Sequence, residues 1–163
     1  MGPDSIRSDQ RMAISVCEVS ITEAPLDLPA QNDDPQAGGV VVFWGAVRAT
    51  EDGREIAGIE YEAHREMAEH QLRQIAQQAI ETFALELIVV HHRIGFIAAG
   101  ESSLFMRVAS GHRAEAFRAS QWVVDELKRK VPIWKRPKFK IDKVPAKAAK
   151  GDQQTETRLI SGV

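Results

Sequence analysis

Hydrophobic and polar positions divide the chain into segments of different period. Four short segments are rich in β-branched and aromatic residues, which predicts β-strands. The predicted strands are residues 40–48, 56–63, 87–95 and 103–110. A turn at Asp52-Gly53 separates the first two, and a turn that contains Gly100 separates the last two. We therefore expect two pairs of strands, the first of them a hairpin.

Two longer segments space their apolar residues by three and four positions, which predicts amphipathic helices. The first runs from His64 to about Phe83, and the second runs from about His112 to Lys130, where Pro132 stops it. The predicted apolar face of the first helix contains Met67, Leu72, Ile75, Ala76, Ala79, Ile80 and Phe83. The predicted face of the second contains Ala116, Phe117, Ser120, Val123, Val124, Leu127 and Val131. This order of elements predicts an α+β fold, with both helices on one face of a mostly antiparallel sheet.

Length and composition predict one domain. A chain of 163 residues that is 44% hydrophobic can bury one ordinary core. We expect a flexible start at 1–14, a single catalytic domain at 15–140 with a long loop at 23–39, and a polar, poorly ordered tail at 141–163. The sequence has no apolar run near the roughly 20 residues of a spanning helix and no signal peptide, so we expect a cytoplasmic protein without membrane contact.

Positive charge gathers near the end of the chain. Residues 128–150 hold ten Lys and Arg and one acidic residue, although the whole chain has a net charge of −2. The acidic remainder would repel a long polyanion, which favours a small anionic ligand. A nucleic-acid-binding protein that uses this segment, with Trp134 and Phe139 as stacking groups, is the alternative.

Three separated cations could contribute to a site. Lys128 falls at the edge of the apolar face of the second helix, where its ammonium group could be partly removed from water; an ordinary surface lysine fits the same position. Lys135 follows Trp134 in an extended segment that would hold its cation in place. Arg48 ends the first strand after Gly45, where missing side-chain bulk would let a ligand approach, although arginine is also common at strand ends.

His112 and Arg113 lie where the fourth predicted strand passes into the second helix. Unpaired amide groups at a helix start attract anions, and an arginine beside them would reinforce such a site. In the alternative, Ser110 caps the helix and both side chains are only solvated.

Metal ligands and cofactor motifs are not expected. His91 and His92 are neighbours on a predicted strand, so they would point to opposite faces and could not share a metal. Cys17 is the single cysteine, which excludes a thiolate cluster within one chain. The sequence contains no phosphate-binding loop, dinucleotide fingerprint or nucleophile elbow.

Five segments, taken in order, match a known family. They are VVVFWGAVR at 40–48, IEYEAHREMAE at 59–69, VVHHRIG at 89–95, SGHRAEAF at 110–117 and DELKRKVPIWKR at 125–136. With these segments the chain resembles the molybdopterin synthase catalytic (large) subunit family over about residues 39–136. The block 127–135, L-K-x-x-x-P-x-W-K, is the most specific part of the resemblance.

The resemblance implies an α/β hammerhead fold and a sulfurtransferase of molybdenum-cofactor biosynthesis that needs no metal or cofactor of its own. Members of this family take sulfur from the thiocarboxylated Gly-Gly C-terminus of a small ubiquitin-like subunit. They insert two sulfurs into cyclic pyranopterin monophosphate and so form the dithiolene of molybdopterin. They assemble as a homodimer within a heterotetramer, and each pocket draws on both protomers. An inactive paralogue that only binds the partner is a further alternative.

The resemblance also implies roles for individual residues. Lys128 and Lys135 match the two essential lysines of the family. The positions that match its substrate contacts are Ala46, Val47, Arg48, His112, Arg113, Lys128, Lys135, Arg136 and Pro137. The chain departs from the family pattern in two places: Pro137 stands where an acidic residue is common, and the loop 49–52 lacks the usual asparagine.

Overall fold

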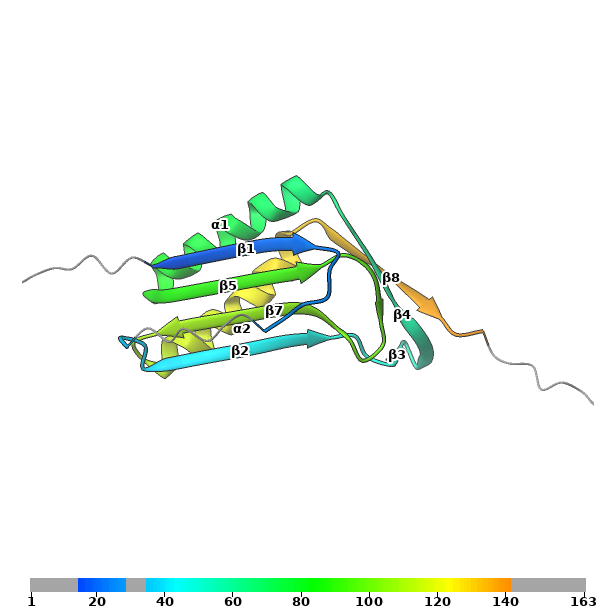
Figure 1. Ribbon diagram of the computed structural model, residues 1–163, viewed down its shortest axis with the longest axis horizontal. Helices are drawn as coiled ribbons and strands as arrows, with labels where there is room; N and C mark the ends of the chain where they lie inside the picture. Colours follow the sequence, from blue (N-terminus) through cyan, green and yellow to red (C-terminus); the bar gives the residue numbers. More distant parts are fainter. Residues whose placement is uncertain (1–14, 29–34, 142–163) are drawn as a thin grey trace, which may run out of the picture.

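The computed structural model describes residues 15–28 and 35–141, which form two helices and eight strands arranged in two sheets (Figure 1). The predicted flexible start at 1–14 lies outside the described residues, and so does all but the first residue of the predicted tail at 141–163. No helix in the described part of the chain is long and apolar enough to cross a membrane.

The first sheet has four strands in the order β1-β5-β7-β2. Its strands are β1 (Val16–Thr22), β5 (Leu85–Arg93), β7 (Ser102–Ser110) and β2 (Gly39–Ala46). Strand β1 pairs with β5 in parallel, whereas the β5–β7 and β7–β2 pairs are antiparallel. The predicted pairing of 87–95 with 103–110 is therefore confirmed. Strand β1 was not predicted, and β2 ends two residues before Arg48.

Both helices, α1 (Arg65–Phe83) and α2 (Arg113–Lys130), cover one face of the first sheet (Figure 1). Helix α1 contacts β1 and β5, and α2 contacts β2 and β7, while the helices also contact each other. The predicted helices are confirmed, but Met67 and Phe117 were wrongly assigned to their buried faces, since they are 49% and 63% exposed. Ala68 and Ala119 are buried on those faces instead.

The second sheet is built around β4. Its strands are β3 (Thr50–Glu51), β4 (Arg54–Ala63), β6 (Gly95–Ala98) and β8 (Ile133–Phe139). Strand β4 pairs with β3, β6 and β8, and all three pairs are antiparallel. The segment that was predicted to be only an extended tail is thus β8. Strand β6, which was predicted to be part of a turn, belongs to the second sheet, and the chain enters it from β5 and returns to the first sheet at β7.

The predicted hairpin of residues 40–48 with residues 56–63 is wrong, because these two strands do not pair with each other. Strand β2 pairs with β7, and the turn at Asp52-Gly53 joins β4 to the short β3 instead. Both turn residues have positive φ, 50° and 74°, as a tight two-residue hairpin turn requires. At Gly95, a φ of 86° lets the chain bend between β5 and β6. The α+β class, with two helices on one face of a mostly antiparallel sheet, is confirmed.

Candidate functional site

A cleft of about 620 Å³ opens between the two sheets and the C-terminal end of α2. Part of its lining is apolar, from Phe43, Ile59, Leu104, Leu127, Val131 and Ile133. Three cationic side chains, those of Arg48, Lys128 and Lys135, also line it. Its volume lies within the range of roughly 300–1,000 Å³ that is typical of small-molecule sites.

Each cation comes from a different element. Arg48 follows Val47, which is 2% exposed and anchors the loop beyond β2. Lys128 belongs to the last turn of α2. Lys135 lies on β8 directly opposite Tyr61 of β4. The three positive charges therefore meet through tertiary packing of segments that are far apart in the sequence.

The cleft is open in the single chain. The side chains of Arg48 and Lys135 are 77% and 54% exposed, and Lys128 is exposed as well. The exposure of Lys128 in the single chain favours the ordinary surface lysine of the two alternatives, although the residue also lines the cleft. Charges in such a cleft are screened by water, and their interactions would strengthen if another surface covered them.

Glu51 also lines the cleft, and sequence reasoning did not identify it. Its Oε1 lies 2.7 Å from Nζ of Lys135, and its Oε2 lies 3.3 Å from Nη2 of Arg48. The hydrogen bond from Lys135, together with the positive charges of Lys135 and Arg48, holds the pKa of the Glu51 carboxyl below its usual value. No local pattern could reveal this contact, because Glu51 and Lys135 are 84 positions apart in the sequence.

His92 forms a buried part of the cleft wall and is 5% exposed. Its Nδ1 lies 2.8 Å from the carbonyl oxygen of Arg93 and donates to it in the neutral tautomer that this contact favours. Its ring packs edge-on against Tyr61, with 5.5 Å between ring centroids. His91 points to the other face and contacts Glu18, as predicted for neighbours on a strand. In residues 15–28 and 35–141, no group of three potential ligands could hold a metal.

Burial lowers the pKa of His92 below its usual value, although the hydrogen bond with Arg93 opposes this shift. Below about pH 6.5 the unfolded chain binds a proton at this residue and the folded chain does not, so stability falls as the pH drops. Relative to His92→Gln, the free energy of unfolding of the wild type should fall by up to about 1.4 kcal/mol for each pH unit below about 6.5, until the lowered pKa is reached.

Urea unfolding at pH 7.5, 6.5 and 5.5 measures this difference. The control is His70→Gln, because His70 is exposed on α1. If the His92→Gln and wild-type stabilities change in parallel over this range, burial of a neutral His92 is refuted.

The structure places some of the predicted substrate contacts in the cleft and others away from it. Of the predicted site residues, Ala46, Val47, Arg48, Lys128 and Lys135 line the cleft, whereas His112, Arg113, Arg136 and Pro137 do not. Arg113 begins α2 and Lys128 lies in its last turn, so about 22 Å of helix separates them. Helix α2 has no side-chain cap, which excludes the predicted cap from Ser110 and leaves the first amide groups of the helix without one.

The basic segment does not form one continuous stripe in the part that the structure describes. Most of its cations are paired with acidic side chains from several different elements. The pairs are Arg129 and Lys130 with Glu126, Lys135 with Glu51, Arg136 with Glu62 and Lys140 with Glu55. A surface that tracks a nucleic-acid backbone needs cations aligned along a groove, so this arrangement argues against the nucleic-acid alternative.

A family model described as MoaE protein matches residues 21–130, about two thirds of the chain. The chain belongs to the MoaE family. The molybdopterin synthase catalytic subunit of Thermoplasma volcanium is 40% identical over 121 residues, which cover 72% of this chain and 88% of that protein. The crystal structure of molybdopterin synthase from Staphylococcus aureus superimposes with a TM-score of 0.68 at 31% identity, covering 76% of this chain and 90% of that one.

A solved complex of subunits 1 and 2 of molybdopterin-converting factor from Helicobacter pylori shares the fold. Its matching chain has a TM-score of 0.58 and 19% identity, covering 77% of this chain and 91% of that one. The MoaE family match confirms the predicted family and the enzyme class, a sulfurtransferase of molybdenum-cofactor biosynthesis.

Proposed function

We propose that this MoaE-family chain transfers sulfur from the thiocarboxylated Gly-Gly C-terminus of a small ubiquitin-like subunit to cyclic pyranopterin monophosphate. Residues 15–140 would act as one catalytic domain, in the cytoplasm. The convergence of Arg48, Lys128 and Lys135 from three elements on one cleft carries this proposal. A solved complex of two converting-factor subunits on the same fold supports the existence of a small-subunit partner.

The cations fit the charge changes of the reaction. Release of sulfur from a thiocarboxylate builds negative charge on the acyl oxygen or sulfur, and a fixed ammonium group stabilises that charge. Lys128 is the residue that we assign to this role. The forked guanidinium of Arg48 suits the cyclic phosphate, and Lys135 supplies a second cation beside it. The small subunit would cover the cleft when its tail enters, and exclusion of water would strengthen these interactions.

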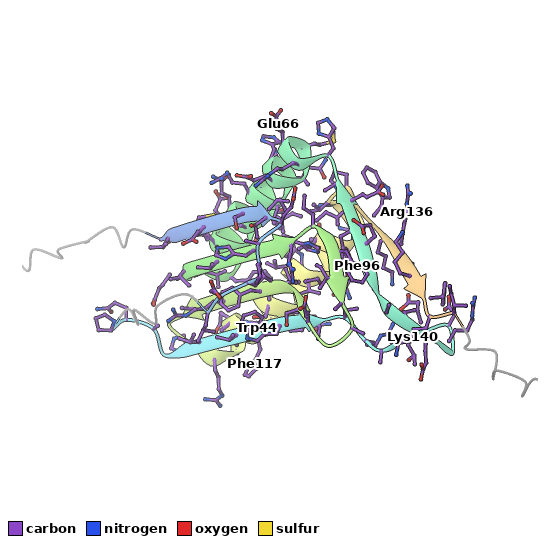
Figure 2. The ribbon with its side chains drawn as sticks, turned by 45° about the vertical axis from the view of Figure 1, so that its right-hand side comes forward. Trp44, Glu66, Phe96, Phe117, Arg136 and Lys140 are labelled. Atoms are coloured by element: carbon purple, nitrogen blue, oxygen red, sulfur yellow. The ribbon has the colours of Figure 1, made fainter. Side chains whose placement is uncertain are left out.

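The homodimer implied by the family fits the exposed border at β2. Within the described chain, β2 is an edge strand of the first sheet, so one side of its backbone has no neighbouring strand. Large apolar side chains along it are partly exposed, and Phe117 of α2 lies along the same border in Figure 2. The exposed apolar side chains of β2 are Val40 at 40%, Val42 at 46%, Phe43 at 39% and Trp44 at 37% exposure. An exposed apolar edge strand is a typical surface for pairing with a second copy.

A two-fold axis at β2 would also explain why His112 and Arg113, two of the predicted substrate contacts, lie away from the cleft of their own chain. The first residue of β2 packs against the start of α2, since a Cβ on Gly39 would lie 2.7 Å from Cα of Arg113. The last residue of β2, Ala46, lines the cleft. Antiparallel pairing of two β2 strands exchanges these ends, so Arg113 and His112 of one protomer would approach the cleft of the other.

The direct test supplies the chain with cyclic pyranopterin monophosphate and a thiocarboxylated small subunit. We expect dithiolene product, and we expect a small subunit without its last two glycines to bind more weakly and give no product. If the bound small subunit narrows the open cleft to a channel, only residues without side chains can pass through it to the cations. Normal turnover with the shortened subunit would refute tail insertion.

The same assay separates the alternatives. Partner binding without any product would identify an inactive paralogue. RNA binding that is lost between about 50 and 200 mM salt, again without product, would identify a nucleic-acid-binding protein.

A further inference from the structure

We propose that Glu51 is a positioning residue that holds Lys135 and Arg48 together as one prearranged anion-binding pair in the cleft. This inference rests on the proposed function, since it concerns how the same cleft receives an anionic substrate. The carboxylate bridges both cations, with 2.7 Å from Oε1 to Nζ of Lys135 and 3.3 Å from Oε2 to Nη2 of Arg48.

The position of Glu51 is set by the backbone. It lies on β3 directly opposite Arg54 of β4, and the tight turn at Asp52-Gly53 closes this hairpin. Lys135 lies on β8, which pairs with β4 as well. Both partners of the 2.7 Å contact therefore lie on strands that pair with β4, opposite Arg54 and Tyr61, which limits how far their backbones can move apart.

The exposure of the three side chains shows that Glu51 supports the two cations from below and does not block access to them. The Glu51 side chain is 13% exposed, whereas those of Lys135 and Arg48 are 54% and 77% exposed. The carboxylate therefore lies beneath the cations. An ammonium group has three N–H donors and a guanidinium has five, and one nitrogen of each contacts Glu51. The remaining donors are available to an incoming anion.

The contacts of Glu51 contribute little to stability, because exposed ion pairs are screened by water. The contacts of Glu51 instead restrict the conformations of the Lys135 and Arg48 side chains. Free lysine and arginine side chains occupy many rotamers, and an anion that binds them must restrict that freedom. A carboxylate that already restricts both side chains removes part of this cost from substrate binding. Because its pKa is lowered, Glu51 stays ionised, and thus able to hold both cations, at a pH where an ordinary glutamate begins to take up a proton.

The test compares Glu51→Gln with Glu55→Gln. Glu55 belongs to the same hairpin and forms an ion pair with Lys140 at 3.5 Å, outside the lining of the cleft. Its variant therefore removes an equal charge without changing the contacts of Lys135 and Arg48. Glu51→Asp, which keeps the charge on a shorter side chain, serves as a second variant and should restore part of the function. Circular dichroism and thermal unfolding verify that each variant is folded.

The first readout is the rate at which reductive methylation modifies Lys135 in the free subunit, followed by mass spectrometry. We expect Glu51→Gln to raise this rate several-fold and Glu55→Gln to leave it unchanged. An unchanged rate in Glu51→Gln overturns the proposal, because the carboxylate then does not hold Lys135. This readout does not depend on the reaction, so it remains valid even if the wild type makes no dithiolene and the proposed function fails.

The second readout is turnover with cyclic pyranopterin monophosphate and the thiocarboxylated small subunit. We expect Glu51→Gln to lower kcat/KM about 10-fold, because misplaced cations stabilise the reacting groups less well. Glu55→Gln should match the wild type. An unchanged kcat/KM would mean that the contact is only structural, and an increase would mean that Glu51 competes with the substrate; either result overturns the proposal.

Discussion

Replacing Lys128 with alanine is expected to lower the rate of sulfur transfer by on the order of 100-fold or more. Lys128 lies in the last turn of α2, and its side chain lines the cleft beside Arg48 and Lys135. If its ammonium group stabilises the charge that develops when the thiocarboxylate reacts, nothing else in that position replaces it. The loss should appear in kcat, because the interaction strengthens as the charge develops.

The fold should tolerate the Lys128 substitution. The side chain is exposed, and alanine favours the helix, so thermal unfolding should change little. Lys138→Ala is the matched control, since it removes an exposed lysine of β8 that does not line the cleft. A Lys128→Ala protein with normal turnover would remove Lys128 from this role, whatever the outcome for the other cations.

Mixed dimers should recover the activity that two separate substitutions remove. We expect Lys128→Ala and Arg113→Ala homodimers each to fall on the order of 100-fold in rate. If each pocket takes Lys128 from one protomer and Arg113 from the other, a dimer of one chain of each kind has one pocket with both defects and one with none. The purified mixed dimer should therefore show about half of the wild-type rate.

The mixed dimer is isolated with a different affinity tag on each chain, and turnover is measured per dimer. A dimer of two differently tagged Lys128→Ala chains is the control, because two copies of the same defect cannot complement each other. If the mixed dimer stays as inactive as its parents, each pocket uses Lys128 and Arg113 of a single chain or does not use Arg113. Association through β2 would then lose its functional support.

Some of the fold could be read from local pattern, and some could not. Both helices were predicted because their apolar residues repeat at the helical period over many turns. Strand β1 was missed although its sequence predicts it, since Cys17, Val19 and Ile21 alternate with polar residues; only its pairing with β5, about 70 positions away, needed the structure. The pairing of β2 with β7 instead of β4 has the same origin, because hydrophobic alternation marks a strand without naming its partner.

The family, the two helices and the identity of the cations could all be predicted from the amino-acid sequence, because these depend on spacing and on short motifs such as 127–135. Which of those cations lie together depends on the folded chain. It brought Arg48, Lys128 and Lys135 into one cleft, added Glu51 beneath two of them, and left Arg113 at the far end of α2. The physical reason is that contacts between residues far apart in the sequence are set by strand pairing and by the packing of helices on a sheet, which the local period of a sequence does not encode.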